Sequence, residues 1–191
     1  RFKEARALYE KTESLYLDEL DAAPMERMTE FFHKMSREIQ MESGNFNEIQ
    51  AQLKEEGWEP GAYYCSYPSF VDTYRVMARV MERSGQSVYL MLCTILDERK
   101  KHQANSEGLK KVSDKLRESI QQSLRHGDVF TRYNKSQFLV LLMGLRKEES
   151  TVIINRIDTC FRRQESSRRV HVTYRTASIA YISEENSTFT L

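Results

Sequence analysis

Residues 87–96 constrain the fold of this chain more than any other segment. The run reads Ser-Val-Tyr-Leu-Met-Leu-Cys-Thr-Ile-Leu, follows Gly85 and ends at the charged stretch 97–101. A continuous apolar run that is bounded by turn and charged residues is typical of a central strand buried on both faces. We therefore expect a β-strand over residues 87–96.

The sequence after this strand alternates between helical and strand periodicity. A helical stripe of Leu and Ile runs through residues 106–125, and a second amphipathic pattern covers residues 148–163. Between them lie two β-rich runs, 128–133 and 137–143, joined by the tight turn Asn134-Lys135-Ser136, and a last β-prone run covers 169–182. The order of elements from residue 87 onward is therefore β-α-β-β-α-β.

This order predicts an α+β fold of the split βαβ, or ferredoxin-like, arrangement. Such a fold has an antiparallel four-stranded sheet with two helices on one face. Because this fold hosts many unrelated functions, the fold alone does not decide what the chain does.

The first part of the chain reads as helical. Apolar residues in helical phase predict helices over 3–20 and 24–40, the second with Met28, Phe31, Phe32 and Met35 on one face. A short helix follows from Phe46 and stops at Gly57. A loop with aromatic residues then leads into a helix over 69–83. We therefore divide the chain into a helical segment, 1–60, and a second domain, 61–191, that includes its lead-in helix.

Charge and cysteine content exclude several classes of protein. The net charge of +1 provides no field for nucleic acid or an anionic membrane, so DNA contact is expected only through a domain upstream of this chain. The longest apolar run is too short to span a bilayer, which favours a cytoplasmic location. Three widely spaced cysteines, Cys65, Cys93 and Cys160, are interpreted as buried apolar residues. Neither they nor the four histidines show metal-ligand spacing, so we expect no metal and no cofactor.

Residues 124–142 resemble the segment of diguanylate cyclases that leads through the GGDEF hairpin into the following strand. In that family an Arg-x-x-Asp element precedes a short connector, the GGDEF signature and an apolar strand. Here Arg125 and Asp128 match the first element, residues 129–133 match the connector and residues 138–142 match the strand. The resemblance implies a nucleotide-cyclase-like fold, which agrees with the β-α-β-β-α-β order.

The signature itself is degenerate. It reads Asn134-Lys135-Ser136-Gln137-Phe138, so only the Phe is kept. The resemblance also places two metal-binding carboxylates of the family at Thr94 and Leu96, and Asp97 is one residue out of register. Because a hydroxyl or an amide is a much poorer Mg²⁺ ligand than a carboxylate, we expect no catalytic residues and no enzyme activity.

The pair Arg125 and Asp128 has two interpretations. Its spacing resembles the inhibitory site at which many GGDEF domains bind cyclic di-GMP, with Arg on phosphate or guanine and Asp accepting from guanine. The structural alternative is an Arg at a helix C-terminus followed by ordinary Gly-Asp turn chemistry. Both interpretations remain open at the level of sequence.

The helical segment resembles the last helices of a bacterial transcriptional activator domain, a tetratricopeptide-like unit. The matching stretches are residues 4–9 and 17–24, where Asp21 replaces the family's Gly. The two resemblances together imply a non-catalytic regulatory or interaction module of a bacterial transcriptional regulator, with a protein partner or self-association. A cyclic di-GMP or nucleotide receptor without turnover is the alternative, and an active diguanylate cyclase is the least favoured reading.

Overall fold

A computed structural model of the 191-residue chain describes residues 2–20, 26–37, 45–53, 60–97, 106–145 and 149–180. None of the helices within these residues combines the length and the apolar character that crossing a bilayer requires.

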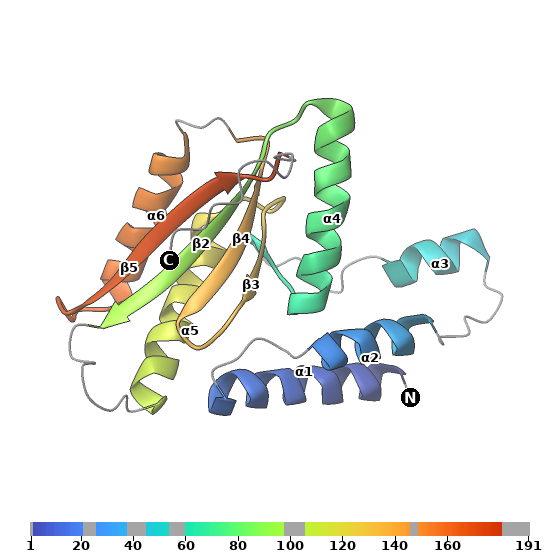
Figure 1. Cartoon of the computed structure of the whole chain (residues 1–191), viewed down its shortest axis with the longest axis horizontal. Helices are drawn as coiled ribbons and strands as arrows, with labels where there is room; N and C mark the ends of the chain where they lie inside the picture. The colour runs from blue at the N-terminus through green and yellow to red at the C-terminus, as the bar shows by residue number, and fades with distance from the viewer. Residues whose placement is uncertain are drawn as a thin grey trace.

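The centre of the molecule is a sheet with the strand order β1-β3-β4-β2-β5 (Figure 1). Its antiparallel part consists of β2 (Val88–Asp97), β3 (Val129–Arg132), β4 (Gln137–Met143) and β5 (Val170–Ser178). These strands confirm the predicted α+β arrangement of β-α-β-β-α-β order, in which β2 lies between β4 and β5. The apolar run therefore does form a central strand.

The sheet has a fifth strand that the sequence pattern did not reveal. β1 (Tyr63–Tyr64) pairs parallel with the beginning of β3, in a segment for which we expected a loop. Two adjacent tyrosines carry no alternation of apolar and polar residues, so their extended conformation comes from pairing with β3. The expectation of a purely antiparallel four-stranded sheet was wrong in this respect.

Two helices cover one face of the sheet. These are α5 (Ser106–Ser123) and α6 (Glu149–Gln164), which lie within two residues of their predicted bounds. They pack on the strands through the larger apolar core, whose fully buried members include Met91, Leu116, Ile120, Phe130, Phe138, Ile157 and Phe161.

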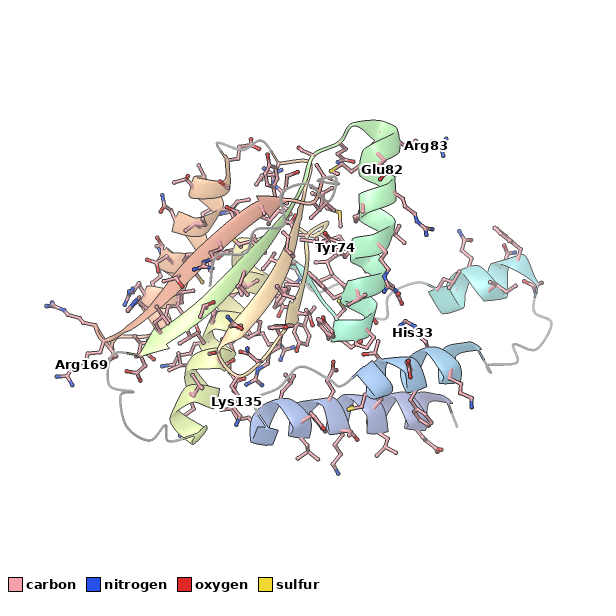
Figure 2. All side chains as sticks on the ribbon, in the orientation of Figure 1. His33, Tyr74, Glu82, Arg83, Lys135 and Arg169 are labelled. Atoms are coloured by element: carbon pink, nitrogen blue, oxygen red, sulfur yellow. The ribbon has the colours of Figure 1, made fainter. Side chains whose placement is uncertain are left out.

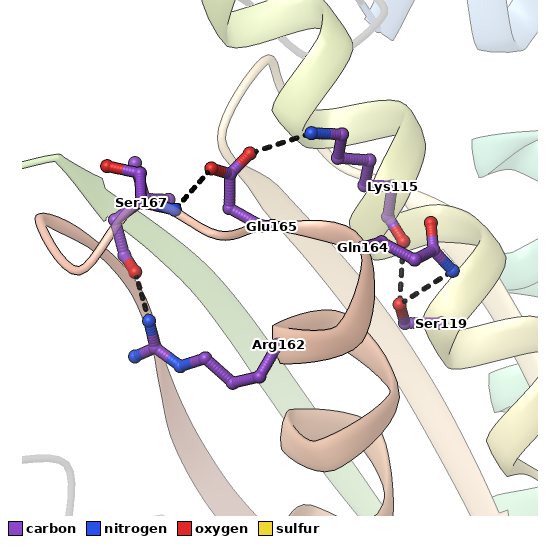
Figure 3. A network of polar contacts seen from close by, with 7 residues as sticks. Lys115, Ser119, Arg162, Gln164, Glu165 and Ser167 are labelled. Atoms are coloured by element: carbon purple, nitrogen blue, oxygen red, sulfur yellow. Dashed lines mark hydrogen bonds and ion pairs between the residues drawn. The ribbon is translucent and has the colours of Figure 1, made fainter.

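Polar contacts fix α6 against α5 and against the start of β5 (Figure 3). Lys115 Nζ lies 2.9 Å from Glu165 Oε2, and Glu165 Oε1 accepts a hydrogen bond from the Ser167 amide at 2.9 Å. Arg162 Nη1 donates to the carbonyl of Val170 at 2.7 Å, at the first residue of β5. The turn between α6 and β5 is therefore held from both sides.

The opposite face of the sheet is covered by α4 (Tyr67–Ser84), as Figure 1 shows. Phe70 is buried in a second apolar core with Val88, Val129 and Leu141, and the predicted apolar face Tyr74, Met77, Ala78 and Met81 packs against it. The helix begins two residues earlier than predicted, with a Pro in its first turn, and ends at Gly85 in the left-handed conformation (φ 68°). Helices α5 and α6 thus share one face of the sheet, as expected, and α4, whose position we did not predict, covers the other.

A close approach of two backbones ties the start of this domain to α5. The Ala62 amide donates to the carbonyl of Gln121 at 3.1 Å, and Gly61 has a φ of 101°. A Cβ atom on Gly61 would lie 1.9 Å from that carbonyl oxygen. Only glycine satisfies both the positive φ and the contact at this position.

Three further helices precede the sheet: α1 (Phe2–Leu20), α2 (Glu26–Arg37) and α3 (Phe46–Leu53). They correspond to the predicted helices, although the expected breaks at Pro24 and Gly57 lie outside the described residues. Phe31, on the predicted apolar face of α2, is 61% exposed.

Helices α1 and α2 contact the start of α4. The side chain of Glu13 is buried, and its Oε1 accepts a hydrogen bond from the amide of Tyr67, the first residue of α4, at 3.1 Å. The Ser66 side chain makes no capping bond, so Glu13 of α1 satisfies a free amide of α4. On α2, His33 Nδ1 lies 3.6 Å from Asp72 Oδ2, and Figure 2 places His33 between α2 and the beginning of α4.

The cysteines are free thiols, as expected, but they do not share one environment. Cys65 and Cys93 are buried, and burial raises the pKa of Cys65 to about 12. Cys160 is only partly buried, and its Sγ lies 3.7 Å from Gln122 Oε1 on α5. The interpretation of all three as buried apolar residues was therefore wrong for Cys160.

Candidate functional site

The candidate site is the hairpin between β3 and β4 together with the end of β2. The amides of Tyr133 and Asn134 both donate to the carbonyl of Gln137, at 2.9 and 3.3 Å, and the Gln137 amide returns a bond to Asn134 at 3.4 Å. Two residues of the incoming arm thus oppose a single residue of the outgoing arm, which is the pattern of a β-bulge. Lys135 and Ser136 form the tip.

Asn134 organises this tip through its side chain. Its Oδ1 accepts hydrogen bonds from the amide and from the hydroxyl of Ser136, at 2.9 and 3.2 Å. Its Nδ2 donates to Gln137 Oε1 at 2.6 Å. An Asn that bonds its own backbone two residues on is a common turn device, so Asn134 has a structural explanation.

Gln137 connects the hairpin to β2. It stands directly opposite Thr94 in the β2–β4 ladder, and its Nε2 donates to Thr94 Oγ1 at 3.1 Å. The Ile95 amide donates to the carbonyl of Ser136 at 2.8 Å, so the pairing continues to the tip of the hairpin. The side chains of the hairpin and of the end of β2 are therefore bonded directly to one another.

The polar side chains bonded to one another here are two hydroxyls, of Thr94 and Ser136, and two carboxamides, of Asn134 and Gln137. Side chains alternate between the faces of a strand, so Thr94 and Leu96 share one face of β2 while Asp97 lies on the other. Leu96 is 42% exposed. A neutral set of this kind, already engaged in mutual hydrogen bonds, does not fit Mg²⁺, which prefers carboxylate oxygens. No cluster of three His, Cys, Asp or Glu that suits a metal exists among the described residues.

The other predicted pair, Arg125 and Asp128, lies at the opposite end of β3 and β4. Asp128 is buried, and both of its carboxylate oxygens accept backbone amides: Oδ2 from Arg125 and Oδ1 from Met143, each at 3.1 Å. Arg125 is exposed. Asp128 therefore connects the end of α5 to the end of β4, a role that the sequence did not reveal.

The environment of Asp128 has opposing effects on its protonation. Burial raises the pKa of this carboxyl above its usual range, and the two backbone amides and the positive charges of Arg125 and Arg156 work in the opposite direction. Burial prevails, because removing a carboxylate from water disfavours its charged form. The carboxylate points into the protein, while the Arg125 side chain is left in solvent.

Aromatic side chains link the start of α4 to the hairpin. The rings of Tyr67 and Tyr133 have centroids 5.7 Å apart, and those of Tyr64 and Phe130 lie 5.1 Å apart. The guanidinium of Arg117 lies 4.1 Å from the centre of the Tyr64 ring. These contacts attach the segment before α4, and the first residue of α4, to β3 and α5.

Comparison with known proteins identifies the family. Residues 74–189, more than half of the chain, match the model of the diguanylate cyclase, GGDEF domain. The chain belongs to the GGDEF family. The match includes most of α4, the central strands and the hairpin between β3 and β4.

Solved structures of GGDEF proteins resemble the chain only distantly. A diguanylate cyclase protein from Thermotoga maritima is 15% identical, with a TM-score of 0.48, and the match covers 61% of this chain and 81% of that one. Diguanylate cyclase SiaD from Pseudomonas aeruginosa, solved in complex with its activator SiaC, is 15% identical with a TM-score of 0.48. That match covers 95% of this chain and 67% of SiaD. No curated protein matches the chain.

Proposed function

We propose that this chain is a non-catalytic regulatory and interaction module of a bacterial transcriptional regulator, in which a degenerate GGDEF domain serves docking, dimerisation or signal sensing. One observation carries the proposal. Gln137 and Thr94 occupy positions that the family resemblance assigns to carboxylates, and their neutral side chains are hydrogen-bonded to each other at 3.1 Å.

The chemistry of cyclisation explains why this observation matters. Phosphoryl transfer depends on divalent metal ions that neutralise charge on the phosphates, and these ions are held by carboxylates. A hydroxyl and an amide bring no negative charge. Lys135 also adds a long side chain where the family's second glycine lets the backbone approach the nucleotide.

The N-terminal helices support a role in intramolecular or protein contacts. Glu13 and His33 touch the first turns of α4, and α4 covers one face of the GGDEF domain. The resemblance of residues 4–9 and 17–24 to a transcriptional activator domain gives these helices a place in a multidomain regulator. DNA binding would then belong to another domain of that regulator.

A direct assay tests the absence of catalysis. Purified protein incubated with GTP and Mg²⁺ or Mn²⁺ is expected to form no cyclic di-GMP above background, with an active diguanylate cyclase run in parallel as the positive control. Product that disappears in Ser136→Ala or Gln137→Ala, but persists in the exposed-surface control Val152→Ala, would contradict the proposal.

The alternative proposal, a cyclic di-GMP receptor without turnover, depends on Arg125 and Asp128. Because both carboxylate oxygens of Asp128 already accept backbone amides, we expect calorimetry to detect no saturable binding at ligand concentrations of tens of micromolar. Saturable binding that Arg125→Ala weakens by about 1.5–3 kcal/mol, typical of a hydrogen bond to a charged group, would establish the receptor instead.

A further inference from the structure

Helix α3 has an apolar row that nothing in the described chain covers. Phe46, Ile49 and Leu53 follow one another at intervals of three and four residues, so they share one face of the helix. They are 77%, 45% and 79% exposed, and Figure 1 shows α3 apart from the sheet. Because an isolated helix of eight residues is marginal in water, α3 requires a surface to pack against.

The acidic composition of residues 38–59, the stretch of sequence that contains α3, restricts what that surface can be. Residues 38–59 contain a single basic residue, Lys54, and six glutamates: Glu38, Glu42, Glu48, Glu55, Glu56 and Glu59. Residues 1–60 as a whole carry 8 basic and 14 acidic residues, whereas residues 61–191 carry 21 basic and 14 acidic residues. A surface that complements α3 is therefore apolar with a basic border.

The outer face of α4 has this composition. Val76 and Val80 are 52% and 37% exposed, one turn apart, and they lie beside the exposed arginines Arg75, Arg79 and Arg83. Figure 2 shows Arg83 extending away from the sheet at the end of α4. Arg75 has an anionic neighbour on α4 itself, since its Nη1 lies 3.9 Å from Asp72 Oδ1. Arg79 and Arg83 are four residues apart, and like charges at this interval destabilise a helix unless an anionic partner offsets them.

The exposed face of α4 that contains Val76, Val80 and Arg83 is as long as the apolar row of α3. From Phe46 to Leu53, and equally from Val76 to Arg83, there are seven helical steps, which correspond to about 10 Å. Both rows are exposed in a single chain, so neither covers the other there.

We propose that α3 of one copy packs on the outer face of α4 of a second copy, and that the exchange is reciprocal. A reciprocal exchange creates a closed two-fold dimer in which each contact occurs twice. The inference rests on the proposed role as an interaction module and names its partner as a second copy of this chain. The two proposals can fail independently. A chain that does not self-associate is still expected to form no cyclic di-GMP, so the cyclase assay does not test the dimer.

Sedimentation velocity of the full chain over a concentration series tests the dimer. We expect a reversible monomer–dimer equilibrium that weakens as salt is raised, since the contact includes exposed charges. Leu53→Asp and Val80→Asp should each weaken association roughly tenfold or more, because each opposes a charge to an apolar row. The matched control is Val152→Asp on α6, which is also exposed and should leave association unchanged.

A mixture of the two variants separates the exchange from other arrangements. The heterodimer of Leu53→Asp with Val80→Asp retains one contact in which both rows are intact, so the mixture should associate more tightly than either variant alone. A chain that stays monomeric at all concentrations overturns the proposal. If only Val80→Asp weakens association, α4 pairs with α4 and the proposal is wrong. The proposal is also wrong if the protein does not self-associate and instead sediments with anionic vesicles.

Discussion

Replacing Thr94 by Asp and Gln137 by Glu together would put two carboxylates where a 3.1 Å hydrogen bond now joins neutral groups. Two unit charges about 4 Å apart repel by about 1 kcal/mol in water and by about 4 kcal/mol at the effective dielectric near a protein surface. Each single variant keeps a bond, because the Gln137 amide can donate to the carboxylate of Thr94→Asp and the Thr94 hydroxyl can donate to the carboxylate of Gln137→Glu. We therefore expect an unfavourable coupling energy of about 1–4 kcal/mol in the double variant.

Urea unfolding of the four proteins, with chelator and with excess Mg²⁺, measures this coupling. The penalty should shrink in Mg²⁺, since a ligand that binds only the folded state at about 100 times its Kd stabilises by about 2.7 kcal/mol. The control is Gln137→Glu combined with Val152→Asp at an exposed position, and the effects of these two substitutions on the free energy of unfolding should add. Additive effects of the Thr94 and Gln137 substitutions, without any dependence on metal, would refute the geometry at the hairpin.

Three further substitutions test other parts of the structure. Gly61→Ala should destabilise by about 2–4 kcal/mol in urea unfolding, because φ is positive and Cβ would meet the Gln121 carbonyl, whereas Gly127→Ala, with open space around it, should change stability by less than about 0.5 kcal/mol. A thiol reagent should modify Cys160 first, because burial raises the pKa of the other two thiols, and Cys160→Ser should abolish this first reaction. Asp128→Asn should lose about 1–3 kcal/mol, because its amide NH₂ faces a backbone donor. The pKa of Asp128 is raised in the folded state, so as pH falls the folded state binds the proton before the unfolded state does. The stability advantage of the wild type over Asp128→Asn should therefore grow as pH falls through the folded-state pKa toward the ordinary value of 3.8.

The sequence predicted the elements whose residues alternate or repeat. The apolar run of β2 and the apolar stripe of α5 could be recognised in the sequence. A strand buried on both faces gives a continuous apolar run, whereas a helix buried on one face gives apolar residues at intervals of three and four. β1 has no such mark, since its two tyrosines become a strand only by pairing with β3. The position of α4 could not be predicted either, because an amphipathic pattern shows that a helix packs but not on which face of a sheet.

The sequence predicted the hairpin but not its contacts. The turn residues 134–136 predicted a hairpin, and β4 begins at Gln137 as expected. That Gln137 bonds Thr94 follows from the register of β2 and β4, which the sequence does not contain. Asp128 also accepts a hydrogen bond from the amide of Met143, 15 residues later, and the short spacing between Arg125 and Asp128 gave no indication of this contact.

The carboxylate of Glu13 at the start of α4 also bears on how the chain folds. Most helices obtain their first capping bond from a neighbour in sequence, but here the acceptor lies 54 residues away. Contacts between distant residues form late, because closing the intervening loop costs entropy before the contact repays it. We expect α4 to pack on the sheet first and to acquire the Glu13 contact afterwards, so that loss of Glu13 should accelerate unfolding and leave the rate of folding nearly unchanged.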